Sequence, residues 1–364
     1  NGCQLAPPVM GATAFLIAEF LDIPYIEVVV AAALPALIYY FILFAQVDFM
    51  AKDNNLKGLS RSELPRFSLL LRTRGLHLIP IFLLIFLMFG IGLQPAKSAI
   101  ISGFSAYFFG LIMRESKLNK ESLSAFMNSV SQTMIPIILI GGAAGIIVGV
   151  LNITGLGFNL TLGLTEIGKN YGLISMLILT GMVAIILGMG MPTAAVYIVL
   201  SVVLAPAVIE MGIPVLAAHL FIFYFGLLSM ITPPVAVASF VAAGIADASM
   251  WKTSFTAMKL GIAAYLLPFL FVFNDSLLFK GTWIEILYIS LTCLVSGLIL
   301  SHVLRVNLKS GVRQILSNFF YLMCSILIGT STLWLGRDSN LIILVLFFGI
   351  LLFYRANKNE KLDG

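Results

Sequence analysis

Two interruptions of apolar helical runs carry residue types suited to binding a small ion. One reads GMGMPT at 188–193, and the other reads ITPP at 231–234. Proline leaves carbonyl groups of the preceding turn unpaired, and glycine lets two backbones approach a small ligand closely. Threonine hydroxyls add oxygen ligands without placing a formal charge in an apolar environment. The pattern therefore favours a site that binds a small cation through oxygen ligands.

The helices around these two segments must hold them in place inside an apolar medium. An unpaired backbone group in hydrocarbon is costly, so a broken helix persists only where it lines a cavity walled by protein or water. The freed helix ends supply N–H donors for an anionic group and carbonyls for a cation. This arrangement is typical of a carrier. A simple kink between packed helices is the alternative interpretation.

Composition places the chain in a membrane. Hydrophobic residues make up 60% of the 364 residues and charged residues only 10%, whereas a soluble domain carries about 25% charged residues. Apolar runs of about 18 or more residues recur, and each can cross a hydrocarbon core of roughly 30 Å. We therefore expect an all-α polytopic membrane protein. The net charge of +5 then reflects the loops and does not indicate nucleic acid binding.

The three cysteines are scattered along the chain and form no CxxC or Cys/His cluster. This spacing favours small apolar packing residues over a disulfide framework or a metal centre. We expect no organic cofactor.

The apolar runs predict a series of helices. In chain order they are a short helix at 9–21, crossings near 25–47, 75–93 and 95–113, an interfacial helix at 114–133 leading past Pro136 into a span at 137–151, a loop at 152–170, a hairpin at 171–209 with arms 171–188 and 194–209, a broken crossing at 215–230 and 235–246, a crossing near 253–273, and three C-terminal spans near 284–304, 315–335 and 340–354.

The distribution of positive charge favours a hairpin at 171–209 that re-enters the membrane without crossing it. With that topology, all but four of the 21 Lys and Arg fall on the cytoplasmic side, together with the loop at 48–74. If the two arms formed one crossing, every later loop would change sides and the asymmetry would disappear.

Two segments of the chain are similar to each other. Residues 4–22 read QLAPPVMGATAFLIAEFLD, and residues 230–247 read MITPPVAVASFVAAGIAD. Each is followed by a crossing with an internal proline, Pro35 or Pro268. In the charge-based topology the aspartates that end the two segments lie on opposite sides, as in the inverted repeats of secondary carriers. A chance match between short motifs is the alternative.

The repeat divides the chain into parts. They are 1–47 as the end of the first inverted repeat, 48–74 as a cytoplasmic loop, 75–133 as scaffold helices and the interfacial helix, 134–273 as the second inverted repeat with its re-entrant hairpin (171–209) and broken helix (215–246), and 274–364 as an extension of three transmembrane helices.

Three stretches carry a family resemblance. GMGMPTAAVYIVLSVVLAPAVIEMGIP, HLFIFYFGLLSMITPPVAVASFVAAGIA and the opening QLAPPVMGATAFLIAEFLDIPY resemble the large membrane subunit of tripartite ATP-independent periplasmic (TRAP) transporters. The loop sequence LKGLSRSELPR and the three C-terminal spans resemble those of the fused permeases of the TAXI-type branch. Because the opening is the interior of a motif, we expect the chain to be the C-terminal portion of a longer permease.

The resemblance implies an elevator-type carrier of the ion-transporter superfamily fold, placed in the inner membrane. It would use Na⁺ to take up a small organic anion that a secreted binding protein delivers. In that family the hairpin tips and helix breaks hold the ions and the substrate. The matching positions here are Gly188, Gly190, Pro192, Thr193, Thr232, Pro233, Pro234, Pro7 and Pro8. We predict Thr193 and Thr232 as Na⁺ ligands, with both breaks meeting around one ion.

Two other functions are compatible with parts of the pattern. A stand-alone Na⁺- or H⁺-coupled carrier of di- or tricarboxylates would share the fold without needing a binding protein. An intramembrane lipid-modifying enzyme would need paired acids, a His–acid pair or a metal cluster at one depth, and the sequence shows no such set, so we expect no enzyme. His219 either lines a cavity and transfers protons or, as we favour, is a packed histidine.

Overall fold

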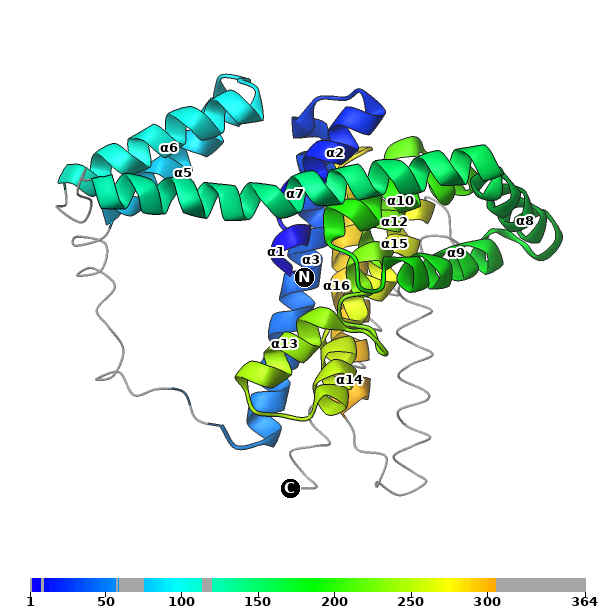
Figure 1. Cartoon of the computed structure of the whole chain (residues 1–364). Coiled ribbons are helices and arrows are strands. Elements are labelled where there is room, and N and C mark those ends of the chain that lie inside the picture. Colours follow the sequence, from blue (N-terminus) through cyan, green and yellow to red (C-terminus); the bar gives the residue numbers. More distant parts are fainter. Residues whose placement is uncertain (1, 8–9, 57, 59–74, 113–119, 306–364) are drawn as a thin grey trace. The chain divides into compact units, whose positions relative to one another are not determined.

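Every regular element in the described part of the chain is a helix (Figure 1). The computed structural model describes residues 2–7, 10–56, 58, 75–112 and 120–305. It has two units: the first is made of the residues up to Asn55 and those from Ala143 onward, and the second is Leu56–Gly142. The all-α architecture expected from the composition is confirmed.

The first unit contains most of the helices. They are α1 (Gly2–Leu5), α2 (Gly11–Leu21), α3 (Tyr25–Asp53), α8 (Leu156–Tyr171), α9 (Leu173–Gly188), α10 (Thr193–Val203), α11 (Ala205–Glu210), α12 (Val215–Leu228), α13 (Val237–Ile245), α14 (Met250–Leu260), α15 (Ile262–Phe273), the 3-10 turn η3 (Asp275–Leu278) and α16 (Trp283–Arg305).

Three stretches in the described residues are long and apolar enough to cross a membrane by themselves. They are Tyr25–Asp53, Met250–Phe273 and Trp283–Ser301. The helices α9, α10 and α12 are apolar but shorter. A helix rises about 1.5 Å per residue, so these shorter helices reach only part of the way through a core of roughly 30 Å.

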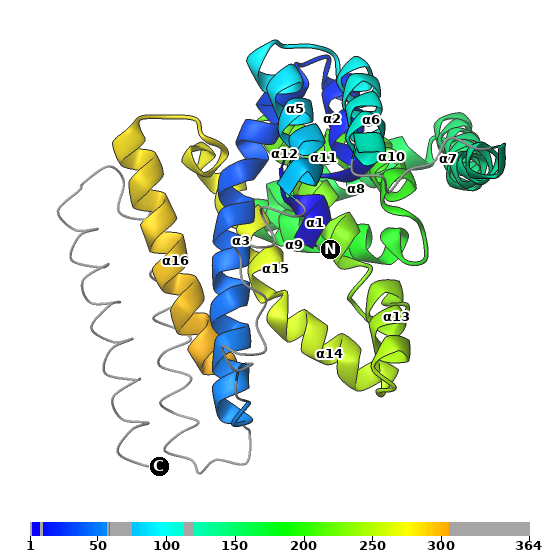
Figure 2. The ribbon, with the colours of Figure 1, turned by 90° about the vertical axis from the view of Figure 1, so that its left-hand side faces the viewer.

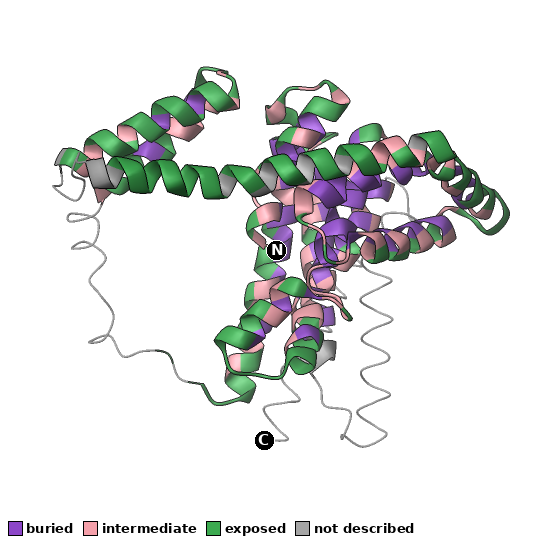
Figure 3. Cartoon of the chain, viewed as in Figure 1, coloured by how far each residue is buried: buried purple, intermediate pink, exposed green. Residues whose placement is uncertain are grey.

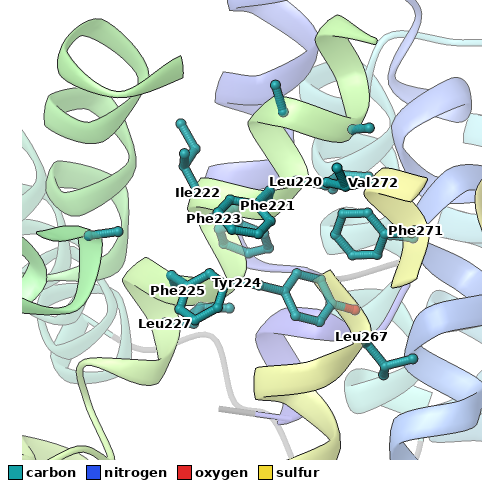
Figure 4. Packing of buried hydrophobic residues seen from close by; sticks show 14 of the residues in the cluster. Leu220, Phe221, Ile222, Phe223, Tyr224, Phe225, Leu227, Leu267, Phe271 and Val272 are labelled. Atoms are coloured by element: carbon teal, nitrogen blue, oxygen red, sulfur yellow. The ribbon is translucent and has the colours of Figure 1, made fainter. Parts of the chain in front are cut away.

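Helix α12 lies at the centre of the first unit. All of its residues from Leu216 to Leu228 are buried, and a helix that is apolar on every side must be enclosed by other helices. It contacts α9, α10 and α15. Figure 4 shows its aromatic side chains close to Phe271 of α15, and Tyr224 packs edge-on against Phe271 with ring centroids 5.6 Å apart. The buried residues gather around this helix in Figure 3.

Helices α3 and α16 lie side by side, as Figure 2 shows. They approach closely where Gly297 meets Ile42, since a Cβ on this glycine would overlap the isoleucine side chain. Helix α3 continues to Asp53, six residues beyond the end expected for the crossing. Its last turns are exposed, and the Asp48–Lys52 ion pair at 2.6 Å supports them.

Residues 156–171 form a helix, so the prediction of a loop at 152–170 was wrong. Helix α8 buries one stripe at helical spacing, made of Thr161, Leu164, Thr165 and Gly168. Two threonines and a glycine give this stripe a low hydrophobicity, which concealed the helical period in the sequence.

The expected interfacial helix and the span after it form one helix, α7 (Lys120–Thr154). Its described residues continue through Pro136 without a stop. A proline removes one backbone hydrogen bond, and a long helix keeps the bonds on either side.

Within the described residues, the second unit contains two antiparallel helical segments and part of α7. The first segment is η1 (Gly75–Leu78), α5 (Ile79–Ile85) and the π-turn η2 (Phe86–Gly90), and it contacts α6 (Pro95–Ile112). The C-terminal spans expected at 315–335 and 340–354 lie outside the described residues, whereas the one near 284–304 corresponds to α16.

The half-helices α2 and α13 begin in the same way. Met10 precedes α2 with φ 36°, and Ala236 precedes α13 with φ 31°. The amide of each of these residues donates to the carbonyl four residues earlier, Ala6 at 3.2 Å and Thr232 at 3.3 Å. A residue other than glycine in the left-handed region is uncommon. Because it occurs at matching positions here, both segments follow the same backbone path there.

The two half-helices also end in the same way. Asp22 has φ 52° and Asp247 has φ 49°. The residue after each aspartate donates to the carbonyl five residues earlier, at 3.0 Å and 2.9 Å, as in a Schellman-type C-cap. The segments therefore share their local backbone. Their opposite orientation in a membrane stays a prediction.

Candidate functional site

The tip of the hairpin is a tight turn between α9 and α10. Met189 donates to Ile186 O at 3.3 Å, Met191 donates to Gly188 O at 3.4 Å, and Gly190 has φ 77°. A side chain would be strained at this φ, so glycine suits the position. Helix α10 then starts behind Pro192 without a side-chain cap.

The break between α12 and α13 is a compact loop. Thr232 donates its amide to Leu228 O at 3.0 Å, and the Pro233–Pro234 peptide bond is cis. Beyond the prolines, the amide of Ala238 donates to Met230 O at 3.0 Å, which joins the second half-helix to the end of the first. The ITPP motif therefore lies inside the interruption, as its prolines predict.

The hairpin tip lies against this break. A Cβ placed on Gly188 would lie 2.8 Å from Ser229 Oγ, at the start of the break. A Cβ on Gly190 would lie 3.8 Å from Val235 Cγ1, at its end. The structure thus brings GMGMPT and ITPP together, although no hydrogen bond joins the side chains of Thr193 and Thr232 within the described residues.

Contacts between α8 and α11 show that the hairpin returns to the end from which it started. Thr165 Oγ1 lies 3.3 Å from Glu210 Oε2, and a Cβ on Gly168 would lie 2.9 Å from Met211 Cε. The chain leaves this base along α9, turns at 189–192 and comes back along α10 and α11.

The break and the tip expose complementary backbone groups. No described residue donates a hydrogen bond to the carbonyls of Ile231 or Pro233, so these oxygens can bind a cation. Helices α10 and α13 both lack a side-chain cap, which leaves N–H donors at their first turns. Oxygen ligands next to helix N-termini suit a cation and an anion bound together.

Thr232 is the best-positioned side-chain oxygen in the break. Its hydroxyl lies 2.6 Å from Leu228 O and 2.6 Å from the hydroxyl of Tyr265 on α15. Thr232 and Pro233 are half-buried, whereas Pro234 is exposed. At the tip, Gly188 is buried, Thr193 is half-buried, and Gly190 and Pro192 are exposed.

The first break is less complete. Pro7 is half-buried in the turn that follows α1, and the predicted site residue Pro8 lies outside the described residues. The described residues of this segment therefore allow no comparison with the ITPP loop at the prolines themselves.

His219 is a packed histidine inside α12. Its Nδ1 lies 2.7 Å from the hydroxyl of Tyr197 on α10, and only 7% of its surface is exposed. Because the hydroxyl satisfies one ring nitrogen, the pair joins the hairpin arm to the first half of the broken helix. This geometry agrees with the packing interpretation of His219.

Sequence reasoning missed Ser229 and Tyr265. A tyrosine in an apolar span three residues before Pro268 was a possible signal, but aromatic residues are common throughout such spans. Nothing in the order of residues alone places Tyr265 next to Thr232, which precedes it by 33 positions.

Comparison with known proteins gives the family. Residues 1–302 match the model of the family described as the tripartite ATP-independent periplasmic transporter, DctM component. A search of curated proteins found no match. The narrower resemblance to TAXI-type fused permeases stays a prediction. So does the expectation that the chain is the C-terminal portion of a longer permease. The match covers most of the chain and the whole of the candidate site, in a family of transporters and not of enzymes, so the chain belongs to the DctM family and is a membrane permease subunit of a TRAP transporter.

Proposed function

We propose that this permease couples inward movement of Na⁺ to uptake of a small organic anion. The proposal rests on the contact between the uncapped hairpin tip and the Pro-Pro break, at Gly188–Ser229 and Gly190–Val235. The break offers unpaired carbonyls and the Thr232 hydroxyl to the cation. The N-terminal turns of α10 and α13 offer N–H groups to the anion.

The ion fits the residues present. Na⁺ needs hard oxygen ligands, and carbonyl and hydroxyl oxygens supply them without a buried acid. Thr193 directly follows the proline of the hairpin tip, and Thr232 directly precedes the two prolines of the break. Binding of Na⁺ would neutralise the oxygen-rich side of the site, and the anion would then bind beside a positive charge.

Close glycine contacts suggest that the hairpin and α12 move as one body. A Cβ on Gly226 would lie 2.7 Å from Val196 Cγ1, and a Cβ on Gly181 would lie 2.9 Å from Phe225 Cε1. Such packing leaves no room for the hairpin to slide along α12. It supports an elevator movement, in which the whole site moves from one side of the membrane to the other, rather than a gate that opens at the tip alone.

We further propose that the subunit lies in the inner membrane and receives its substrate from a secreted binding protein. The family of the chain supports both points. A subunit that depends on such a protein needs no high affinity for free anion, because delivery raises the local concentration at the site.

Uptake into proteoliposomes tests this function. The complete transporter is reconstituted with its binding protein, and a panel of radiolabelled carboxylates is offered with an inward Na⁺ gradient. We expect uptake only when the Na⁺ gradient and the binding protein are both present. Equal uptake without the binding protein would identify a stand-alone carrier, and equal uptake from K⁺ medium would refute Na⁺ coupling.

A further inference from the structure

One face of α15 lies along the break. Gly261 and Tyr265 are four residues apart and so share a helix face with Phe269. A Cβ on Gly261 would lie 2.9 Å from Ile231 Cδ1, and the Tyr265 hydroxyl lies 2.6 Å from Thr232 Oγ1. One turn further, Phe269 packs edge-on against two phenylalanines of α12. The tyrosine is therefore held in register with the break by contacts on both sides.

The hydrogen bonds of Thr232 fix the direction of the contact. A threonine hydroxyl has one proton and two acceptor lone pairs. The proton is directed at Leu228 O, 2.6 Å away. Tyr265 must therefore donate, and Thr232 Oγ1 accepts. One lone pair of Thr232 remains, with its direction set by the two bonds already made.

The first half of the chain lacks this pair. When the two halves are aligned on their Pro-Pro motifs, Ala6 takes the position of Thr232. When they are aligned on the internal prolines Pro35 and Pro268, Ala32 takes the position of Tyr265. The backbone bond to Ala6 O matches the bond to Thr232 O, so this bond forms without the polar pair. The pair is therefore free to serve another role.

We propose that Tyr265 is a positioning residue for the coupling ion: its hydroxyl donates to Thr232 and aims the free lone pair of Thr232 Oγ1 at the cation. The inference rests on the proposed Na⁺ coupling. Without the donor, Thr232 gains rotational freedom and binds the ion with a less fixed oxygen. Losing one neutral hydrogen bond should lower the Na⁺ affinity by about three- to tenfold.

The test measures protection by Na⁺ and needs no substrate. The full chain is purified in detergent, and its melting temperature is followed against NaCl, with choline chloride holding the ionic strength constant. Tyr265→Phe should raise the half-protecting Na⁺ concentration by about three- to tenfold. Thr232→Val should raise it further, and adding Tyr265→Phe to Thr232→Val should change nothing more, because the two residues act through one oxygen.

A matched control separates positioning from packing. Tyr224 is buried in α12, and its hydroxyl has no hydrogen-bond partner among the described residues. Tyr224→Phe therefore removes the same atom without breaking a bond, and its half-protecting Na⁺ concentration should equal that of the wild type. Thr232→Ser keeps the hydroxyl and should stay within about twofold of the wild type.

The possible results are distinct. If NaCl protects the wild type no better than choline chloride, the proposed Na⁺ coupling fails and this inference fails with it. If NaCl protects the wild type and Tyr265→Phe has an unchanged or lower half-protecting concentration, only the role of Tyr265 is overturned. Additive effects of Tyr265→Phe and Thr232→Val would also overturn it.

Discussion

The two Pro-Pro segments lead into half-helices that begin and end alike, but their surroundings differ. Each leads through a left-handed residue into a short half-helix, and each half-helix ends at a left-handed aspartate. The second break also contacts the hairpin tip through Ser229 and contacts α15 through Thr232. The first break has Ala6 where the second has Thr232. The two segments thus share the starts and ends of their half-helices, while the hydroxyls of Ser229, Thr232 and Tyr265 are present only around the second break.

The largest expected difference between the breaks is in Na⁺ dependence. Thr232→Val keeps the side-chain shape and removes an oxygen ligand, so the Na⁺ concentration for half-maximal uptake should rise by about ten- to hundredfold, the cost of a hydrogen bond to a charged group. Ala6→Val in the first break should change it by less than about twofold. Uptake assays in the complete transporter give both values. Equal effects at the two positions would show that the breaks are functionally alike.

The contact with the hairpin tip should have the next largest effect. In Gly188→Ala the new methyl group meets Ser229 Oγ at 2.8 Å, and overpacking of this kind costs about 1–3 kcal/mol. Gly244→Ala on α13 meets nothing within 4 Å and should be neutral or slightly stabilising. Melting temperatures of the purified variants compare the two. Adding Ser229→Gly to Gly188→Ala should recover part of the stability, because the contact with Val196 Cγ1 at 3.1 Å remains. No recovery at all would place the clash elsewhere.

The smallest effects should be equal in the two halves. Asp22→Ala and Asp247→Ala each put alanine at a left-handed position, where it costs roughly 1 kcal/mol. Asp22→Gly and Asp247→Gly should be close to neutral, since glycine adopts this conformation freely. Melting temperatures should fall by similar amounts for the two alanine variants. A large effect at only one aspartate would contradict the shared turn.

The local chemistry of proline and glycine made the broken helix predictable. Proline cannot continue the hydrogen-bond ladder, and α12 stops at Leu228, a few residues before Pro233. The family resemblance rested on the same motifs and is confirmed. Helix α8 was missed because its buried stripe contains threonines and a glycine, so its pattern resembles that of a loop.

The contacts of the site were less predictable than its motifs. The bond from Tyr265 to Thr232 depends on the register of α15 against the break, which the close approach of Gly261 to Ile231 sets in three dimensions. The same holds for the bond between Tyr197 and His219, which come from different helices. Apolar sequences contain many aromatic residues, and only packing selects those that reach a polar partner.

Binding of radioactive Na⁺ to the purified protein tests most directly whether the hairpin tip and the second break form one ion site. We expect saturable binding to the wild type and a weaker affinity, by about tenfold or more, in both Thr193→Val and Thr232→Val. In the double variant, we expect the loss of affinity to be smaller than the product of the two single losses, because both oxygens serve the same ion. Unchanged Na⁺ affinity in either single variant, or independent effects in the double variant, would contradict a shared site.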